Sequence, residues 1–135
     1  MKANVQFINP EELMKNPAFS QVVTTQGSGK TIYIGGQNAV NAKREIIGKG
    51  NLQQQTQQVM ENITTALSAC GATLKDIVKL NINIVQGQNA YEAFLVSQKF
   101  VDGINPPAIT VLFVAGLANA DFLIEIEATA FVGDE

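Results

Sequence analysis

The spacing of apolar and polar residues along the chain predicts where its regular elements lie. Residues 76–85 alternate between apolar and polar positions, which is typical of a strand with one buried face. Residues 51–70 instead carry apolar side chains at helical spacing, with Asn51 as the expected N-cap and Gly71 as the expected end. A second helix is expected over residues 90–102. Shorter apolar runs predict further strands at residues 3–8, 19–26, 30–36, 108–116 and 122–132.

The order of these elements predicts a single α+β domain over residues 1–135. The turn residues at 27–29 predict a hairpin between the second and third strands. Strands that alternate with two helices indicate a sandwich, in which about six strands form one mixed sheet and both helices cover one of its faces. The other face would have no cover from its own chain, which predicts oligomerisation. We also expect the apolar strand at 108–116 to be covered on both faces.

The composition argues against several classes of partner. The chain is 46% hydrophobic and 16% charged, with a net charge of −3, so it has no electrostatic footprint for a nucleic-acid backbone. Its apolar runs are too short to span a bilayer and no leader sequence opens the chain, so no membrane partner is expected. The single cysteine, Cys70, suits a cytoplasmic location, and its place on the apolar stripe of a helix indicates a structural role.

The residue types that the chain lacks limit its chemistry. It has no histidine, which excludes Ser-His-Asp and Cys-His catalysis and zinc sites built on imidazole. Arg44 is its one arginine, so bidentate clamps for carboxylate or phosphate are scarce. Any chemistry must therefore rest on carboxylates, lysines, tyrosines, hydroxyls, backbone groups or bound water. We expect neither a cofactor nor a metal ion.

Two short segments are candidates for a site. Glu125 and Glu127 are two residues apart in a predicted strand, so both side chains point to the same face. Paired carboxylates can divide acid and base roles, although such a strand more often faces solvent. Gly35 and Gly36 end another strand, where they leave room for a ligand near backbone N–H groups, with a tight turn as the alternative. The glutamine-rich run at 53–58 is interpreted as the solvated first turns of a helix.

Five segments extend these local patterns to nearly the whole chain. They are IYIGGQ at 32–37, GKGNLQQQTQQVMENI at 48–63, LSACGATLKDIVKLNINI at 67–84, NPPAITVLFVAGL at 105–117 and LIEIEATA at 123–130. In this order and spacing, they resemble the RidA (YjgF) family of small imine and enamine deaminases. The resemblance implies a chorismate-mutase-like α+β sandwich assembled as a homotrimer, with ligand sites in the clefts between subunits.

The family's signature strand falls on Pro107 and the residues that follow it. The resemblance places the arginine that binds a substrate carboxylate at Ile109, and the cysteine found two residues later at Val111. Thr110 lies between them and remains a candidate polar contact. An isoleucine cannot bind a carboxylate, and the loss of a charged hydrogen bond at a buried site costs about 2–5 kcal/mol. Standard deamination of amino-acid-derived imines is therefore not expected.

The other family positions are partly kept. Gly35 stands where the family has a serine, and Gly36 matches the glycine whose backbone lies in the cleft. Phe19 corresponds to a site tyrosine and lacks its hydroxyl. Glu125 matches the glutamate that positions the attacking water. The resemblance thus implies a cleft with Glu125 as the catalytic acid or base and with an apolar wall.

Three functions follow from the sequence. The first is a homotrimer that binds a small carbonyl or imine metabolite, and that hydrolyses or deaminates it if Glu125 activates water. The second is a module that senses a metabolite in the same clefts without converting it. The third is an endoribonuclease of the kind attributed to some family members, against which the negative net charge, the single arginine and the lack of histidine argue.

Overall fold

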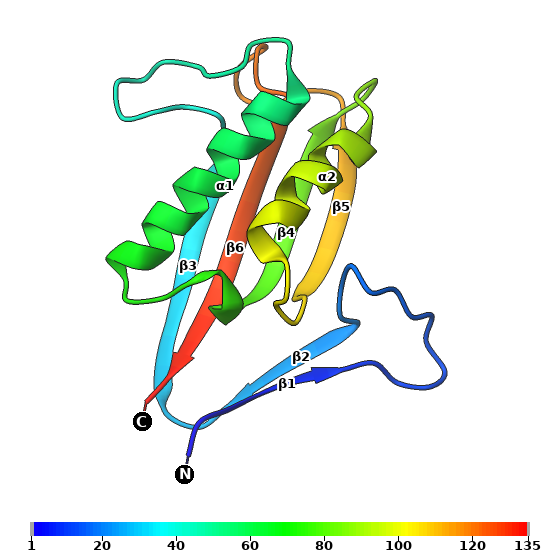
Figure 1. Cartoon of the computed structure of the whole chain (residues 1–135), viewed down its shortest axis with the longest axis vertical. Coiled ribbons are helices and arrows are strands. Elements are labelled where there is room, and N and C mark those ends of the chain that lie inside the picture. The colour runs from blue at the N-terminus through cyan, green and yellow to red at the C-terminus, as the bar shows by residue number, and fades with distance from the viewer. Residues whose placement is uncertain (1, 135) are drawn as a thin grey trace.

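The computed structural model describes residues 2–134. Both predicted helices and all the predicted strands are present, and the helices lie side by side over one face of a sheet (Figure 1). This confirms the α+β class. In chain order the elements are β1 (Asn4–Ile8), β2 (Val22–Gln26), β3 (Gly29–Gln37), α1 (Leu52–Ala69), the 3-10 turn η1 (Leu74–Asp76), β4 (Ile77–Val85), α2 (Ala90–Val101), β5 (Ala108–Val114) and β6 (Ile124–Gly133).

The main sheet has four strands in the order β3-β6-β4-β5. All neighbours are antiparallel except β4 and β5, which run parallel and are joined through α2. A parallel pair needs such a crossover connection, whereas antiparallel strands do not. β5 is the last strand in this order, so it is an edge strand, and it lies beside α2 at one side of the molecule (Figure 1).

The predicted hairpin between the second and third strands is wrong, and with it the single sheet of about six strands. β2 pairs with β1 in a separate two-stranded sheet, and β3 pairs with β6 instead. The chain does turn at Gly27, whose φ is +92°. However, a Cβ on Gly29 would lie 2.5 Å from the Phe131 ring, so the chain is already packed against β6 at this point. The turn residues are local, and they carry no information about which edge each strand joins.

The core lies between α1 and the four-stranded sheet. Asn51 caps α1, since its Oδ1 accepts from the Gln54 N–H at 2.9 Å. The stripe of apolar residues predicted for this helix is buried against alternate residues of β6. The largest fully buried apolar members from the two elements are Val59, Met60, Ile63, Leu67, Ile124 and Ile126.

The helix α2 is packed much less closely than α1. It lies beside α1, but Ala93 is its only buried residue. Tyr91 and Phe94 stack on one another and remain 61% and 40% exposed. Within one copy, the expectation that β5 is covered on both faces is wrong. Val111 and Phe113 point to the side of α2, which shields them only partly, and they are 47% and 52% exposed. Leu112 points to the face that the helices do not cover and is 54% exposed.

One glutamine of the 53–58 run departs from its predicted solvated role. Gln55 is completely buried, and its amide joins three backbone positions in two loops. Its Nε2 donates to the Asp121 carbonyl at 2.8 Å and to the Gly48 carbonyl at 3.2 Å, while its Oε1 accepts from the Leu123 N–H at 2.8 Å. Gln55 therefore ties the loop before α1 to the segment that leads into β6.

Replacing Gln55 by leucine is expected to lower the free energy of unfolding by about 3 kcal/mol. Leucine is of similar size, but it leaves two carbonyls and one N–H without this partner, and each buried unpaired group costs about 1–3 kcal/mol. Urea unfolding at fixed protein concentration measures the change. The neighbouring Gln54→Leu, at an exposed position, is the control and should change stability by less than about 0.5 kcal/mol. If Gln55→Leu lowers the free energy of unfolding by less than about 1 kcal/mol, the hydrogen bonds of Gln55 do not tie the two loops together as described.

Candidate functional site

Glu125 and Glu127 lie on the sheet face that points away from the helices. Their neighbours in β6, Ile124 and Ile126, are buried on the helix side, so the alternation of the strand turns both acids to the open face. Glu127 is exposed, and its Oε1 accepts from the Asn81 amide of β4 at 2.7 Å. Glu125 is half-buried, and no hydrogen bond to its carboxylate is present among residues 2–134. The structure therefore separates the two acids, and it leaves Glu125 as the one without a protein partner.

The Glu125 side chain lies directly against Gly36. The pairing of β3 with β6 is irregular between Ile34 and Gln37, so both glycines sit in a bulge. A Cβ built on Gly36 would meet Glu125 Cδ at 2.7 Å, whereas one on Gly35 would meet nothing within 4 Å. Bulges of this kind often re-aim groups beside active sites. Gly36 is therefore needed for the close approach of Glu125, while Gly35 borders open space.

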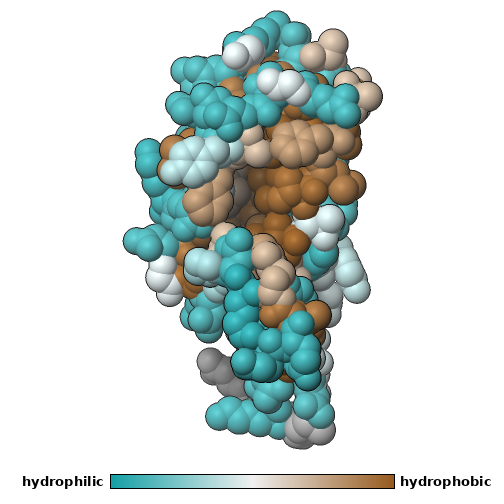
Figure 2. All heavy atoms as spheres, turned by 90° about the vertical axis from the view of Figure 1, so that its right-hand side faces the viewer, coloured by the Kyte–Doolittle hydropathy of each residue, from teal (hydrophilic) through white to brown (hydrophobic). Residues whose placement is uncertain are grey.

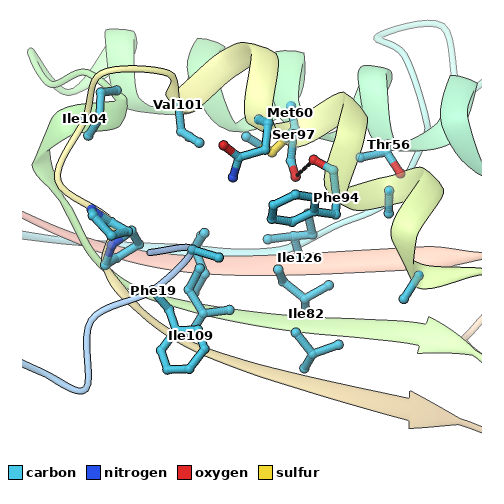
Figure 3. Close-up of a pocket in the computed structure, with 18 of the residues that line it drawn as sticks. Phe19, Thr56, Met60, Ile82, Phe94, Ser97, Val101, Ile104, Ile109 and Ile126 are labelled. Carbon is cyan, nitrogen blue, oxygen red and sulfur yellow. Dashed lines mark hydrogen bonds between the residues drawn. The ribbon is translucent and has the colours of Figure 1, made fainter. Parts of the chain in front are cut away.

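A large pocket lies on the opposite side of the sheet, between α2 and the strands β4, β5 and β6. Its volume is about 540 Å³, and it opens at the side of the molecule where α2 and β5 meet. Figure 2 shows this opening as a hollow surrounded by hydrophobic residues. The side chains labelled in Figure 3 enter it from the helices on one side and from the strands on the other, except Phe19 and Ile104, which lie in loops. They include Phe19, Met60, Ile82, Phe94, Val101, Ile104, Ile109 and Ile126.

The polar groups of this pocket are few. Thr56 and Ser97 already donate their hydroxyl protons to the carbonyls of Leu52 and Phe94, at 2.8 and 3.1 Å. Asp102 is the only charged residue in the lining, and no lysine or arginine among the described residues belongs to it. The Gln98 amide also lines the pocket, and within residues 2–134 it has no hydrogen-bond partner. The pocket is thus largely apolar, and its side-chain polar groups without a hydrogen bond in residues 2–134 are the Gln98 amide, the Asp102 carboxylate and the hydroxyl of Tyr91, which is 61% exposed.

The structure divides the predicted site residues into two groups. Phe19, Ile109 and Val111 line the pocket under α2. Glu125 and Gly36 lie together on the open face, and Gly35 borders the same bulge. Within one chain the two groups are on opposite faces of the sheet.

Thr110 belongs to the open-face group and not to the pocket. It is aligned with Asn81 of β4, while Ile109 before it is aligned with the buried Leu80. The Lys79 ammonium donates to the Thr110 hydroxyl at 2.9 Å on that face. Because successive residues of a strand alternate between faces, Thr110 cannot contact a ligand beside Ile109 from the same side.

Sequence reasoning missed most of the pocket wall. Ile82, Phe94, Ser97 and Val101 were placed in a strand and a helix without a role in binding, yet all four line the pocket. The signal was in α2, whose apolar residues are spread around more of the helix than a single core stripe requires. Such a pattern indicates that the helix has a second apolar side, which can face a pocket as well as the core.

Two kinds of feature are absent from residues 2–134. Nowhere in 2–134 do three or more His, Cys, Asp or Glu side chains gather closely enough to hold a metal ion. The helices of this part of the chain are also too short or too polar to cross a membrane.

Comparisons with known proteins place this geometry in a family. The sequence profile described as endoribonuclease L-PSP matches residues 11–132. A RutC family protein of Pyrococcus horikoshii is 34% identical over 104 residues, which is 77% of this chain and 81% of that protein. A 2-iminobutanoate/2-iminopropanoate deaminase of Dermatophagoides farinae is 27% identical over 81 residues, covering 57% of this chain and 63% of the deaminase.

A solved structure agrees with the fold over nearly the full length. It is a Rid-family protein of unknown function from Yersinia pestis, with a TM-score of 0.86 and 38% identity, covering 96% of this chain and 99% of its own. This likeness confirms the chorismate-mutase-like fold that the sequence predicted. The chain therefore belongs to the endoribonuclease L-PSP family, which is the RidA (YjgF) family.

Proposed function

We propose that this protein is a homotrimer that binds a small carbonyl or imine compound in clefts between its subunits. The observation that carries the proposal is the division of the site. The apolar pocket under α2 and the Glu125–Gly36 pair lie on opposite faces of one sheet, so one copy cannot present both to the same ligand. A second copy could bring its open face, which the chain's own helices do not cover, to the mouth of the pocket.

The chemistry that fits Glu125 is hydrolysis of a C=N bond. The carboxylate accepts a proton from water while the water oxygen adds to the imine carbon, and it then passes this proton to the imine nitrogen. The hydroxyl proton of the resulting carbinolamine is transferred through the same carboxylate to the nitrogen as the C–N bond breaks, which releases ammonia and leaves a carbonyl compound. Glu125 is suited to this role because its carboxylate has no protein hydrogen bond within the described chain, unlike that of Glu127. The deaminase name of one relative supports the same reaction class.

A second candidate is a metabolite sensor that uses the same clefts without conversion. The lack of any lysine or arginine in the described pocket lining favours it, because no cation is present to orient a substrate carboxylate. The single cysteine supports a cytoplasmic location for either function. We do not propose a ribonuclease, since the chain has a net charge of −3, one arginine and no histidine to bind and cleave an RNA backbone.

Light scattering and a turnover assay together test the proposal. The expected particle has three times the mass of the chain. Ammonia release should exceed the uncatalysed rate for an imine without a carboxylate, such as acetophenone imine. A ligand that raises the melting temperature without being converted would favour the sensor. A monomer at micromolar concentration would contradict the proposed inter-subunit site.

A further inference from the structure

We propose that the pocket under α2 selects an uncharged, largely apolar carbonyl or imine compound that carries no carboxylate, and that this ligand completes the packing between α2 and the sheet. The inference rests on the proposed function and names the substrate class of the same site. Three observations support it: the loose packing of α2, the lack of positive charge in the pocket lining, and the few polar groups of the lining that have no hydrogen-bond partner.

The packing of α2 shows a place where the core is incomplete. Ala93 is the one buried residue of this helix, while Ile82 of the strand beneath it is only partly covered. The pocket between them reaches inward to Met60, Ile124 and Ile126, which are each about 1% exposed. Interiors are normally close-packed, and a volume of about 540 Å³ lies in the range typical of ligand sites. A small apolar molecule would supply the contacts that α2 lacks.

The charge of the lining decides between neutral and acidic ligands. A buried carboxylate needs a cation or several donors, and the described lining contains neither lysine nor arginine. Its only charged residue, Asp102, would repel an anion that approached the mouth. Ile109, at the position of the family's arginine, instead adds apolar surface. Each of these features raises the free energy of a bound carboxylate relative to a neutral compound of the same shape.

One half-buried polar side chain remains to orient a neutral ligand, while the Tyr91 hydroxyl belongs to a side chain that is 61% exposed. The donors of Thr56 and Ser97 are committed to backbone carbonyls. The half-buried Gln98 amide has no partner within residues 2–134, so its N–H groups are available to a carbonyl oxygen. Gln98 thus provides one hydrogen bond in an otherwise apolar pocket, which is the usual design of a small-molecule site.

A matched pair of probes tests this selection. Acetophenone is a neutral aryl ketone, and phenylglyoxylate has a carboxylate in place of its methyl group. Calorimetry on the wild-type protein should show acetophenone binding at least about tenfold more tightly, and hydrogen exchange in residues 90–101 should slow when it binds. Ile109→Arg should reverse the preference. Gln57→Arg adds the same charge on the exposed face of α1, outside the pocket, and should leave the preference unchanged.

Val111→Phe is a second pocket variant, which tests the same inference if Ile109→Arg does not fold. Val111 is about half exposed at the pocket, so a larger side chain can enter it without disturbing the core, and it should weaken acetophenone binding about tenfold. Equal or tighter binding of phenylglyoxylate to the wild type, no binding of acetophenone, or no effect of either pocket variant would overturn the inference.

The two proposals can fail separately. If acetophenone binds selectively but acetophenone imine is not hydrolysed, the ligand class stands and the hydrolase fails. If the imine of phenylglyoxylate is hydrolysed as fast as acetophenone imine, the hydrolase stands and the ligand class fails.

Discussion

Replacing Glu125 by glutamine is expected to lower hydrolysis of acetophenone imine by at least about 100-fold. Glutamine keeps the shape of the side chain and its contact with Gly36, but it cannot accept a proton from water. General base catalysis contributes about 10²–10⁴-fold to such steps, so the loss should appear in kcat. Ammonia release above the uncatalysed rate is the measurement.

Glu127→Gln is the matched control for this variant. It makes the same change two residues away on the same strand and face, where the carboxylate already accepts from Asn81. We expect it to keep most of the rate, provided that light scattering shows an unchanged assembly. Glu125→Gln should still bind acetophenone like the wild type, since glutamine keeps the shape of the side chain and the apolar lining of the pocket is unchanged. Full turnover by Glu125→Gln would remove the residue from the mechanism.

Gly36→Ala is expected to give the second large effect, a loss of about 10–100-fold in kcat. The added methyl would lie 2.7 Å from Glu125 Cδ, and the flexible carboxylate must move to avoid it. Displacement of a catalytic group by about 1 Å can cost a hundredfold, while the fold itself is little disturbed. Steady-state kinetics and urea unfolding measured together separate the two effects.

Gly35→Ala serves as the stability control, because its added methyl meets nothing within 4 Å. Both glycine variants should unfold within about 1 kcal/mol of the wild type. If Gly36 acts by positioning Glu125, Gly36→Ala combined with Glu125→Gln should be no slower than Glu125→Gln alone. An additive loss, or an unchanged kcat for Gly36→Ala, would contradict this role.

The sequence predicted the local elements well because each is determined by its own periodicity and ends. The alternation at 76–85 and the cap at Asn51 correspond closely to β4 and to the start of α1. Strand pairing was predicted less well. β2 pairs with β1 and β3 pairs with β6, so the partner of each strand comes from a distant part of the chain, as the contact of Gly29 with Phe131 shows.

The candidate site was predicted as a set of residues, but its geometry was not. The resemblance indicated Glu125 and Ile109 as parts of one cleft, and only the register of β5 against β4 shows them on opposite faces. The pocket itself depends on α2 lying over β4 and beside β5 at a distance that leaves space, which no local pattern specifies. This is why Phe94 and Val101 were missed as wall residues.

Subunit complementation tests the central claim, that one site is formed by Glu125 from one copy and the α2 pocket from another. The two inactive parents are Glu125→Gln and the double variant Ile109→Arg/Val111→Phe, which closes the pocket. Refolded together, they should form mixed trimers in which some sites combine an intact Glu125 with an intact pocket.

Each site needs an intact Glu125 from one subunit and an intact pocket from the next, and in an equal mixture each of these is present in half of the subunits. Random mixing therefore predicts recovery of about a quarter of the wild-type rate of acetophenone imine hydrolysis. Each parent refolded alone should stay inactive. If both parents form trimers and the refolded mixture is no more active than the parents, Glu125 and the pocket do not act together across subunits, and the account is contradicted.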